Sequence, residues 1–245
     1  MTDPHSAYGT AWDSFWRSLS GDPDEVLWDV EPRRAAALDL VRFADLADTR
    51  LPLVDLGCGN GTQTRFFARH FSQVWGVDVS AAALELACSK TTPMNVAYRV
   101  LDALDLEQAA ALHAEIGDAH VYMRGVLQQI RSSDRPAVAR TIEHLMGAVG
   151  IAYLIEYPLR AMDYYQAIAA QYGMPPGLAR VRAHGITPGA LAPEELDTLF
   201  PPERFEVLRQ GETIMHTIHL LPNGLFARPP ALYMVLRRRA TALSA

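Results

Sequence analysis

The sequence of 245 residues contains no apolar run near the roughly 20 residues that a membrane-spanning helix requires. Its first six residues are polar and lack the hydrophobic core of a signal peptide. These absences predict a cytoplasmic protein that has no membrane partner. Hydrophobic residues make up 49% and charged residues 20% of the chain, the balance of a soluble globular protein.

Cationic residues are few. Lysine and arginine together number 22 against 28 aspartates and glutamates, which gives a net charge of −6, and Lys90 is the sole lysine. A protein that covers nucleic acid needs a basic face to neutralise phosphates, so no nucleic-acid partner is expected. Cysteine is scarce as well, and Cys58 and Cys88 are expected to be free thiols in a reducing compartment.

The most informative feature is a short apolar run followed by a glycine-rich turn. Residues 51–56 have the character of a strand buried on both faces, and glycines follow at positions 57, 59 and 61. Such a turn before a helix lets a ligand approach the bare backbone. A dinucleotide fingerprint would need glycine where this chain has Thr62. The spacing therefore disfavours an NAD-dependent oxidoreductase, which stays an alternative.

The ends of the next two apolar runs carry acids. Residues 74–79 end in Asp78-Val79, and the run that begins at Val96 is followed by Asp102-Ala103. A carboxylate at the tip of the second strand can accept hydrogen bonds from two ribose hydroxyls. These positions therefore predict a nucleoside-binding sheet.

The pattern Asp55-x-Gly57-x-Gly59-x-Gly61 with these two acids resembles the motifs of the class I S-adenosylmethionine-dependent methyltransferases. The resemblance spans residues 51–103 and implies S-adenosylmethionine as cofactor, with S-adenosylhomocysteine as product. A non-catalytic protein that binds S-adenosylmethionine is a further alternative, because such motifs report binding only. The cofactor-binding residues implied by the resemblance are Asp55, Gly57, Cys58, Gly59, Gly61, Asp78, Val79, Asp102 and Ala103.

Predicted strands and helices alternate along the rest of the chain, which indicates an α/β fold. The resemblance implies a Rossmann-like, doubly wound, seven-stranded and mostly parallel sheet whose last strand is antiparallel. The later strands are expected at residues 120–124, 151–157, 205–218 and 232–238.

Two segments fall outside this predicted core. Residues 1–50 are expected to form an N-terminal helical cap, and residues 158–203 a substrate lid inserted after the fifth strand. The cofactor-binding core would then comprise residues 51–157, and residues 204–245 would complete the sheet. The insertion starts as a helix and turns rich in glycine and proline, which suits a loop over the open end of the sheet.

Four aromatic residues of the N-terminal segment, Tyr8, Trp12, Phe15 and Trp16, lie at helical spacing on one face. Such a face either docks on the sheet or closes over the ligands, where aromatic rings suit a sulfonium cation. Trp16 is the expected cofactor contact and Tyr8 the expected substrate contact.

The segment after the fourth strand, which begins at Arg124, lies where the family places residues beside the reacting methyl group. Arg124 is expected to pair with the carboxylate of the cofactor, or with an acid at a strand end. Gln128 can donate hydrogen bonds to a substrate but cannot act as a base. Tyr157 and Tyr164 are further expected substrate contacts.

Many relatives carry histidine near Gln128, where this chain has none. A general base is therefore expected from later in the chain. His184, in the lid, is the first candidate and His216 the second. His216 and His219 lie three apart on the expected sixth strand, so they would face opposite sides and make a poor metal pair. No metal site is predicted.

The Asn/Asp-Pro-Pro-aromatic tetrapeptide of enzymes that methylate amino groups of nucleic acids is missing after the fourth strand. The sequence therefore predicts methyl transfer to a small-molecule substrate, with oxygen favoured as the acceptor over nitrogen or carbon. A homodimer is compatible with the sequence, which does not fix the oligomeric state.

Overall fold

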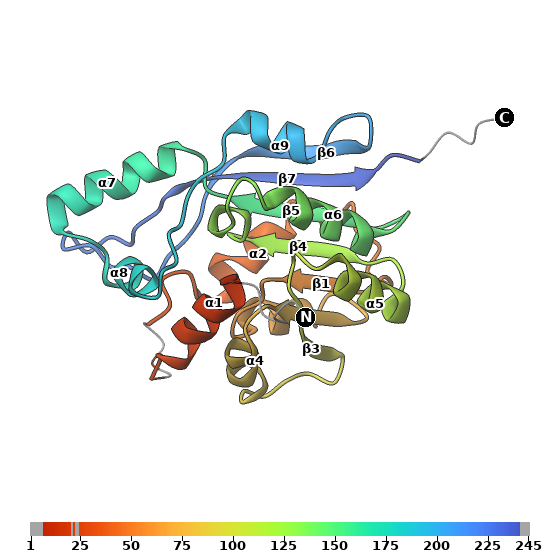
Figure 1. Cartoon of the computed structure of the whole chain (residues 1–245), viewed down its shortest axis with the longest axis horizontal. Coiled ribbons are helices and arrows are strands. Elements are labelled where there is room, and N and C mark those ends of the chain that lie inside the picture. Colours follow the sequence, from red (N-terminus) through yellow and green to blue (C-terminus); the bar gives the residue numbers. More distant parts are fainter. Residues whose placement is uncertain (1–6, 21, 23–24, 241–245) are drawn as a thin grey trace.

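The computed structural model of the chain describes residues 7–20, 22 and 25–240. Within these residues the centre is a seven-stranded sheet of order β3-β2-β1-β4-β5-β7-β6 (Figure 1). The strands are β1 (Leu53–Leu56), β2 (Val74–Asp78), β3 (Val96–Val100), β4 (His120–Arg124), β5 (Ile151–Glu156), β6 (Phe205–Ile214) and β7 (Pro230–Arg238). The helices are α1 (Ala7–Arg17), α2 (Ala36–Leu40), α3 (Thr62–Phe67), α4 (Ala81–Cys88), α5 (Leu106–Ile116), α6 (Arg135–Met146), α7 (Arg160–Tyr172), α8 (Pro176–Ala183) and α9 (Pro193–Leu199), with 3-10 turns η1 (Pro32–Arg34) and η2 (Leu127–Gln129).

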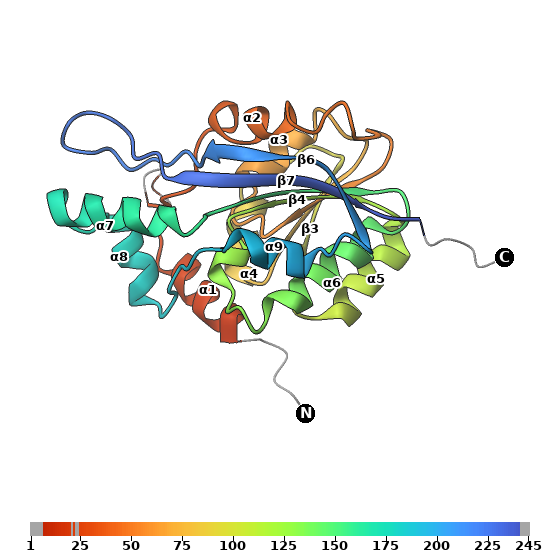
Figure 2. The same ribbon diagram turned by 90° about the horizontal axis from the view of Figure 1, so that it is seen from above.

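The sheet is parallel from β3 through β5, and β7 runs antiparallel to both of its neighbours, β5 and β6. Helices α2 and α3 cover one face and α4, α5 and α6 the other (Figure 2). Because both faces are covered, every residue of β1, β2 and β5 is buried. The predicted Rossmann-like sheet with an antiparallel last strand is thereby confirmed.

Side chains of β4 alternate between two apolar clusters. Val121 and Met123 face the cluster under α5 and α6, whereas Tyr122 packs with Phe67 and Tyr153 on the other face. Arg124 follows two residues after Tyr122, so its side chain leaves the sheet toward α2. This alternation determines which face of the sheet receives the arginine at the strand end.

The prediction that the sixth strand continues to residue 218 is wrong, since β6 ends at Ile214, opposite Pro230. Pro229 and Pro230 lack the N–H groups that would extend the ladder. His216 and His219 therefore lie in the connection to β7, and the predicted opposite orientation along a strand does not apply.

Helices α1, α7 and α8 lie together at the end of the sheet toward which the parallel strands point (Figure 1). By contrast, Leu196 and Leu199 of α9 join the core cluster under α6, so this part of the insertion packs on the body of the fold. In the described part of the chain, no helix has the length and apolarity needed to span a membrane.

Candidate active site

A cavity of about 250 Å³ opens beyond the carboxyl ends of the parallel strands. It lies where the strand order reverses between β1 and β4, the usual ligand position in open α/β sheets. The strand ends form its floor, α1 and α8 pack together on one wall, and Tyr157 with α7 forms the opposite wall. Three separate parts of the chain therefore enclose one space.

The glycine-rich turn after β1 forms part of the floor. Gly57, Gly59 and Gly61 have φ angles of 78°, 54° and 71°, in the left-handed region that favours glycine. Gly57 and Gly59 line the cavity, and a Cβ atom at Gly59 would lie 2.8 Å from the ring of Trp16. The turn thus exposes bare backbone directly beneath an aromatic side chain of α1.

Substitution of Gly59 by alanine is expected to lower the affinity for S-adenosylhomocysteine more than tenfold, because Trp16 must move and the turn is strained. Gly224→Ala is the matched control, since Gly224 has φ 80° and no atom within 4 Å of an added Cβ. Both variants should lose about 1 kcal/mol of stability through backbone strain. Calorimetric titration of both variants makes the comparison, and equal affinities would contradict this role of the Gly59–Trp16 contact.

Asp78 ends β2 and also lines the cavity. Its carboxylate accepts hydrogen bonds from the backbone N–H of Gly59 and of Ser80, both at 2.9 Å. Burial raises the pKa of Asp78 to about 6, although these backbone hydrogen bonds oppose the rise. The side chain is therefore mostly ionised at neutral pH and holds the glycine turn against β2.

Of the other predicted cofactor residues, Val79, Asp102, Ala103, Arg124 and Trp16 also lie in the cavity wall.

Asp55, Cys58 and Gly61 lie outside the lining and shape the turn from behind. Asp55 Oδ2 accepts a hydrogen bond of 2.6 Å from Thr64 Oγ1 of α3, and burial raises the pKa of Asp55 to about 7. Cys58 Sγ donates to the carbonyl oxygen of Gly59 at 3.6 Å, and burial raises its pKa well above the ordinary value. A Cβ at Gly61 would collide with the hydroxyl of Tyr98.

Helix α1 contributes Tyr8, Trp12 and Trp16 to the cavity wall. It is fixed at three points to different parts of the fold. Tyr8 Oη donates to Asp134 Oδ2 at 2.6 Å, Asp13 Oδ1 accepts from Ser80 Oγ and Ala82 N at 2.7 and 3.0 Å, and Ser14 Oγ is hydrogen-bonded to His184 Nδ1 at 2.8 Å. The helix thus bridges from α4 to the loop before α6 and to the end of α8.

Substitution of Asp13 by alanine is expected to cost about 1–2 kcal/mol of stability, because two donors at the start of α4 lose their acceptor. The affinity for S-adenosylhomocysteine should fall several-fold, since Trp16 is carried by the same helix. Thermal unfolding and calorimetry measure the two effects. Asp45→Ala removes an exposed carboxylate paired with Arg209 and should change neither by much.

The opposite wall contains a pair of tyrosines. The hydroxyl groups of Tyr157 and Tyr165 are 3.0 Å apart, and both side chains are buried and line the cavity. Burial raises the pKa of Tyr157 to about 12 and raises that of Tyr165 as well. Both phenols are therefore protonated at neutral pH and can donate hydrogen bonds.

Glu156, the last residue of β5, fixes the segment that follows β4. Its carboxylate accepts hydrogen bonds from the backbone N–H groups of Val126, Leu127 and Gln128 at 2.9 to 3.1 Å. Gln128 Oε1 in turn accepts from the N–H of Tyr157 at 2.8 Å. The predicted substrate residue Gln128 lines the cavity, but its carbonyl oxygen is already used to join two strand ends.

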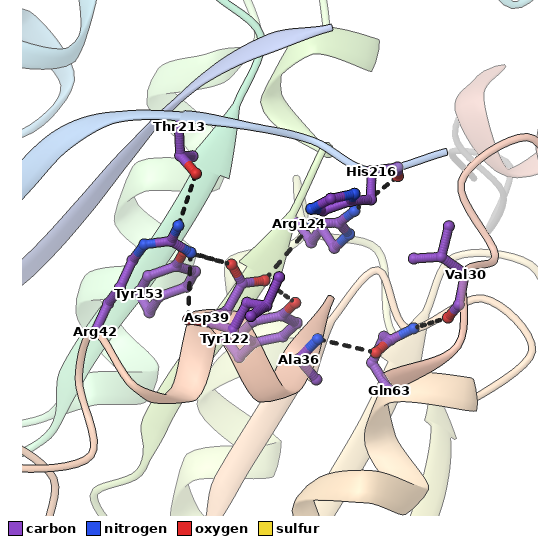
Figure 3. A network of polar contacts seen from close by, with 11 residues as sticks. Val30, Ala36, Asp39, Arg42, Gln63, Tyr122, Arg124, Tyr153, Thr213 and His216 are labelled. Carbon is purple, nitrogen blue, oxygen red and sulfur yellow. Dashed lines mark hydrogen bonds and ion pairs between the residues drawn. The ribbon is translucent and has the colours of Figure 1, made fainter. Parts of the chain in front are cut away.

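Arg124 belongs to a buried polar network behind the cavity floor (Figure 3). Its Nη1 lies 3.6 Å from Asp39 Oδ2, and its Nη2 donates to the carbonyl oxygen of His216 at 3.2 Å. Asp39 also accepts hydrogen bonds from the hydroxyls of Tyr122 and Tyr153 at 2.8 and 2.7 Å. The network joins α2 to the strand ends at the cavity.

Three further predicted residues, the two candidate bases and one candidate substrate contact, also lie outside the cavity lining. The ring of His184 is engaged with Ser14, and Tyr164 Oη accepts a hydrogen bond from the N–H of Arg228. His216 follows the lining residue Met215, and burial together with nearby arginines lowers the pKa of its ring. Across the described residues, no group of three or more His, Cys, Asp or Glu side chains is placed to hold a metal ion.

Sequence reasoning did not assign a role to Asp13, Asp39 or Tyr165. Asp13 and Asp39 carry no local signal, because their partners are distant in sequence. Tyr165 did carry a local signal in the sequence, since Ala161, Tyr165 and Ile168 form a buried stripe at helical spacing.

Comparison with known proteins identifies methyltransferases as relatives of this chain. The family model described as a methyltransferase domain matches residues 53–150. A crystal structure of an S-adenosylmethionine-dependent methyltransferase from Anabaena variabilis is 40% identical, with a TM-score of 0.91, and the match covers 98% of each chain. No curated protein matches the chain.

Two more distant structures share the fold. Magnesium protoporphyrin IX methyltransferase from Synechocystis, with bound S-adenosylhomocysteine, has a TM-score of 0.62 at 14% identity over 95% of this chain and 96% of the other. An N-methyltransferase from Bradyrhizobium japonicum, in complex with the same ligand, has a TM-score of 0.59 at 16% identity over 94% and 100% of the two chains.

Proposed function

Because the chain belongs to the class I S-adenosylmethionine-dependent methyltransferases, with S-adenosylmethionine as its cofactor, we propose that it methylates a small molecule, preferentially on oxygen. The observation that carries this proposal is the enclosure of the cavity by α1, α7 and α8, of which α8 packs with α1. Residues 1–50 would act as a cap and residues 158–203 as a lid, although α9 packs on the core.

The residues at the floor of the cavity fit the cofactor. Gly57 and Gly59 leave backbone bare, Asp78 presents a carboxylate suited to the ribose hydroxyls, and Asp102 presents one suited to the adenine amino group. The indole of Trp16 is a suitable neighbour for a sulfonium cation. When bound, S-adenosylmethionine supplies a methyl group on positively charged sulfur, which departs as a neutral thioether.

The acceptor would lie between this floor and the wall that carries Tyr157. Tyr8 and Gln128 remain proposed substrate contacts from the lining. The walls include Trp12, Trp28, Met162 and Met174, so they suit an apolar body. Holding such a body in line with the methyl group, away from water, can supply much of the acceleration.

His184 and His216 are the two proposed general bases, and their role can be tested by substitution. If His184 or His216 takes the acceptor proton, its replacement by alanine should lower turnover far more than cofactor affinity. Neither ring lines the cavity, so unchanged turnover in both variants would indicate an acceptor that needs no histidine.

The acceptor class can be tested with S-adenosylmethionine that carries a tritiated methyl group. The protein is incubated separately with a low-molecular-mass cell extract, with total RNA and DNA, and with a protein fraction. We expect the label in low-mass products, whose methylated atom is then identified by mass spectrometry and NMR. Label confined to nucleic acid or protein would contradict the proposal.

A further inference from the structure

We propose that Arg124, Tyr157 and Tyr165 form a binding site for a carboxylate at the acceptor end of the cavity. The inference rests on the proposed function in placing the acceptor beside this wall. It deepens that function by naming the chemical group that is recognised.

Arg124 supplies the positive charge. Its side chain lines the cavity and is 9% exposed. A guanidinium has five N–H donors, yet the contacts to Asp39 and to the His216 carbonyl engage only the two terminal nitrogens, and Nε is buried without a partner among the described residues. Nε is too buried to meet a ligand in the cavity, but each terminal nitrogen carries a second N–H group beyond its single contact, so a ligand with lone pairs fits there.

The network behind Arg124 does not fully neutralise it. Asp39 is shared between Arg42, whose Nη1 donates to Oδ1 at 2.9 Å, and Arg124, whose Nη1 lies 3.6 Å from Oδ2 (Figure 3). The same carboxylate also accepts from two tyrosine hydroxyls. One negative charge therefore faces two positive charges, and Arg124 has the weaker share of it.

Beside Arg124 this wall carries two phenol groups that can donate hydrogen bonds, and the other polar side chain of α7 in the lining, Gln166, is uncharged. The hydrogen bond between the hydroxyls of Tyr157 and Tyr165 uses one of their two protons, which leaves one for a ligand. Glu156 lies next to Tyr157, but its oxygens are occupied by three backbone N–H groups. A cation beside a protonated phenol pair selects an anionic oxygen ligand.

Basic groups that could remove a proton are missing from the same wall. Among the described residues that line the cavity there is no histidine or lysine, and the carboxylates, Asp78 and Asp102, belong to the ends of β2 and β3. A carboxylate substrate is already ionised at neutral pH. Its oxygen would form the bond to the methyl carbon with its own electron pair while the carbon–sulfur bond breaks, which gives a methyl ester and a thioether without proton transfer.

Two molecules could bring such a carboxylate, namely the acceptor and the amino-acid part of the cofactor. Calorimetry separates them with the wild type and Arg124→Met. The first comparison is S-adenosylhomocysteine against 5′-methylthioadenosine, which lacks the amino-acid part. The second is benzoate against benzamide, titrated into protein saturated with S-adenosylhomocysteine.

We expect Arg124→Met to lower the second ratio, benzoate against benzamide, about tenfold or more, the size of a lost charge-assisted hydrogen bond. A change confined to the first ratio would assign the carboxylate to the cofactor and would overturn its placement at the acceptor end, whereas a change in the second ratio assigns it to the acceptor. Arg160→Met, which removes an arginine paired with Glu212 outside the cavity, should change neither. Both ratios within twofold of the wild type would overturn the proposal.

Two further variants guard against loss of fold. Arg124→Lys keeps the charge and should retain part of the preference, and Tyr165→Phe should lower the same ratio several-fold while leaving Arg124 in place. These readouts are equilibrium affinities. If the protein does not methylate small molecules, the affinity ratios can still be interpreted. If the carboxylate is not bound, the result of the radiolabel assay still stands.

Discussion

Replacement of Asp78 by asparagine is expected to weaken S-adenosylhomocysteine binding about 10- to 100-fold at pH 8. The carboxylate lines the cavity at the end of β2, and charge-assisted hydrogen bonds to two ribose hydroxyls are roughly twice as strong as neutral ones. Asparagine keeps one oxygen acceptor, whereas alanine would also leave the N–H groups of Gly59 and Ser80 without theirs. Calorimetry measures the affinity, with Asp163→Asn on the exposed face of α7 as control.

The same substitution should remove a pH dependence. The pKa of Asp78 is raised to about 6, so the free protein gains a proton there as the pH falls through 6. If the ligand binds the carboxylate form, its affinity is constant above this pH. Below it, the affinity decreases with falling pH, and the decrease approaches a factor of ten per pH unit. Asp78→Asn should flatten this slope between pH 5 and 7, and a slope that persists unchanged would assign it to another group.

Replacement of Glu156 by alanine is expected to cost about 3–5 kcal/mol of stability. Its side chain is 2% exposed, and the N–H groups of Val126, Leu127 and Gln128 would lose their common acceptor. Each buried donor left unpaired costs about 1–3 kcal/mol before relaxation. Urea unfolding measures the loss. Glu156→Gln keeps one oxygen acceptor, so its stability should lie between those of the wild type and Glu156→Ala.

Glu156 also determines part of the pH dependence of stability. Burial raises its pKa to about 7 from the ordinary 4.5. A raised pKa means that its contribution to stability is fully present below pH 4.5 and is lost as the pH rises through 7. Asp55, whose pKa is raised to about 7, acts in the same direction. The lowered pKa values of His120, His216 and His219 act in the opposite direction over this range. The test is therefore the change in stability between pH 5.5 and pH 8, which should shift in favour of pH 8 in Glu156→Gln relative to the wild type; an unchanged difference would contradict the assignment.

The sequence was sufficient to predict the sheet and the glycine-rich turn, because both depend on local patterns. Buried parallel strands are continuous apolar runs, and left-handed φ angles at the turn favour glycine. The end of β6 was mispredicted because the partner strand begins at Pro230, and neither Pro230 nor Pro229 has an N–H group to extend the ladder.

The cavity wall that carries Tyr157 was harder to predict, because it depends on how elements meet. Tyr164 and Tyr165 are neighbours on α7, and only the packing of that helix brings Tyr165 to Tyr157. The roles of Asp13 and Asp39 arise from contacts across more than 60 residues. No local pattern marks such carboxylates in advance.

The three attachments of α1 have a kinetic consequence. If ligands leave past this helix, each catalytic cycle must break its hydrogen bonds to Asp134, Ser80 and His184 and form them again. Product release would then be slower than methyl transfer, which is common among enzymes that close over their substrates. A rapid first turnover followed by a slower steady state is the expected time course, and Asp13→Ala should accelerate its slow phase.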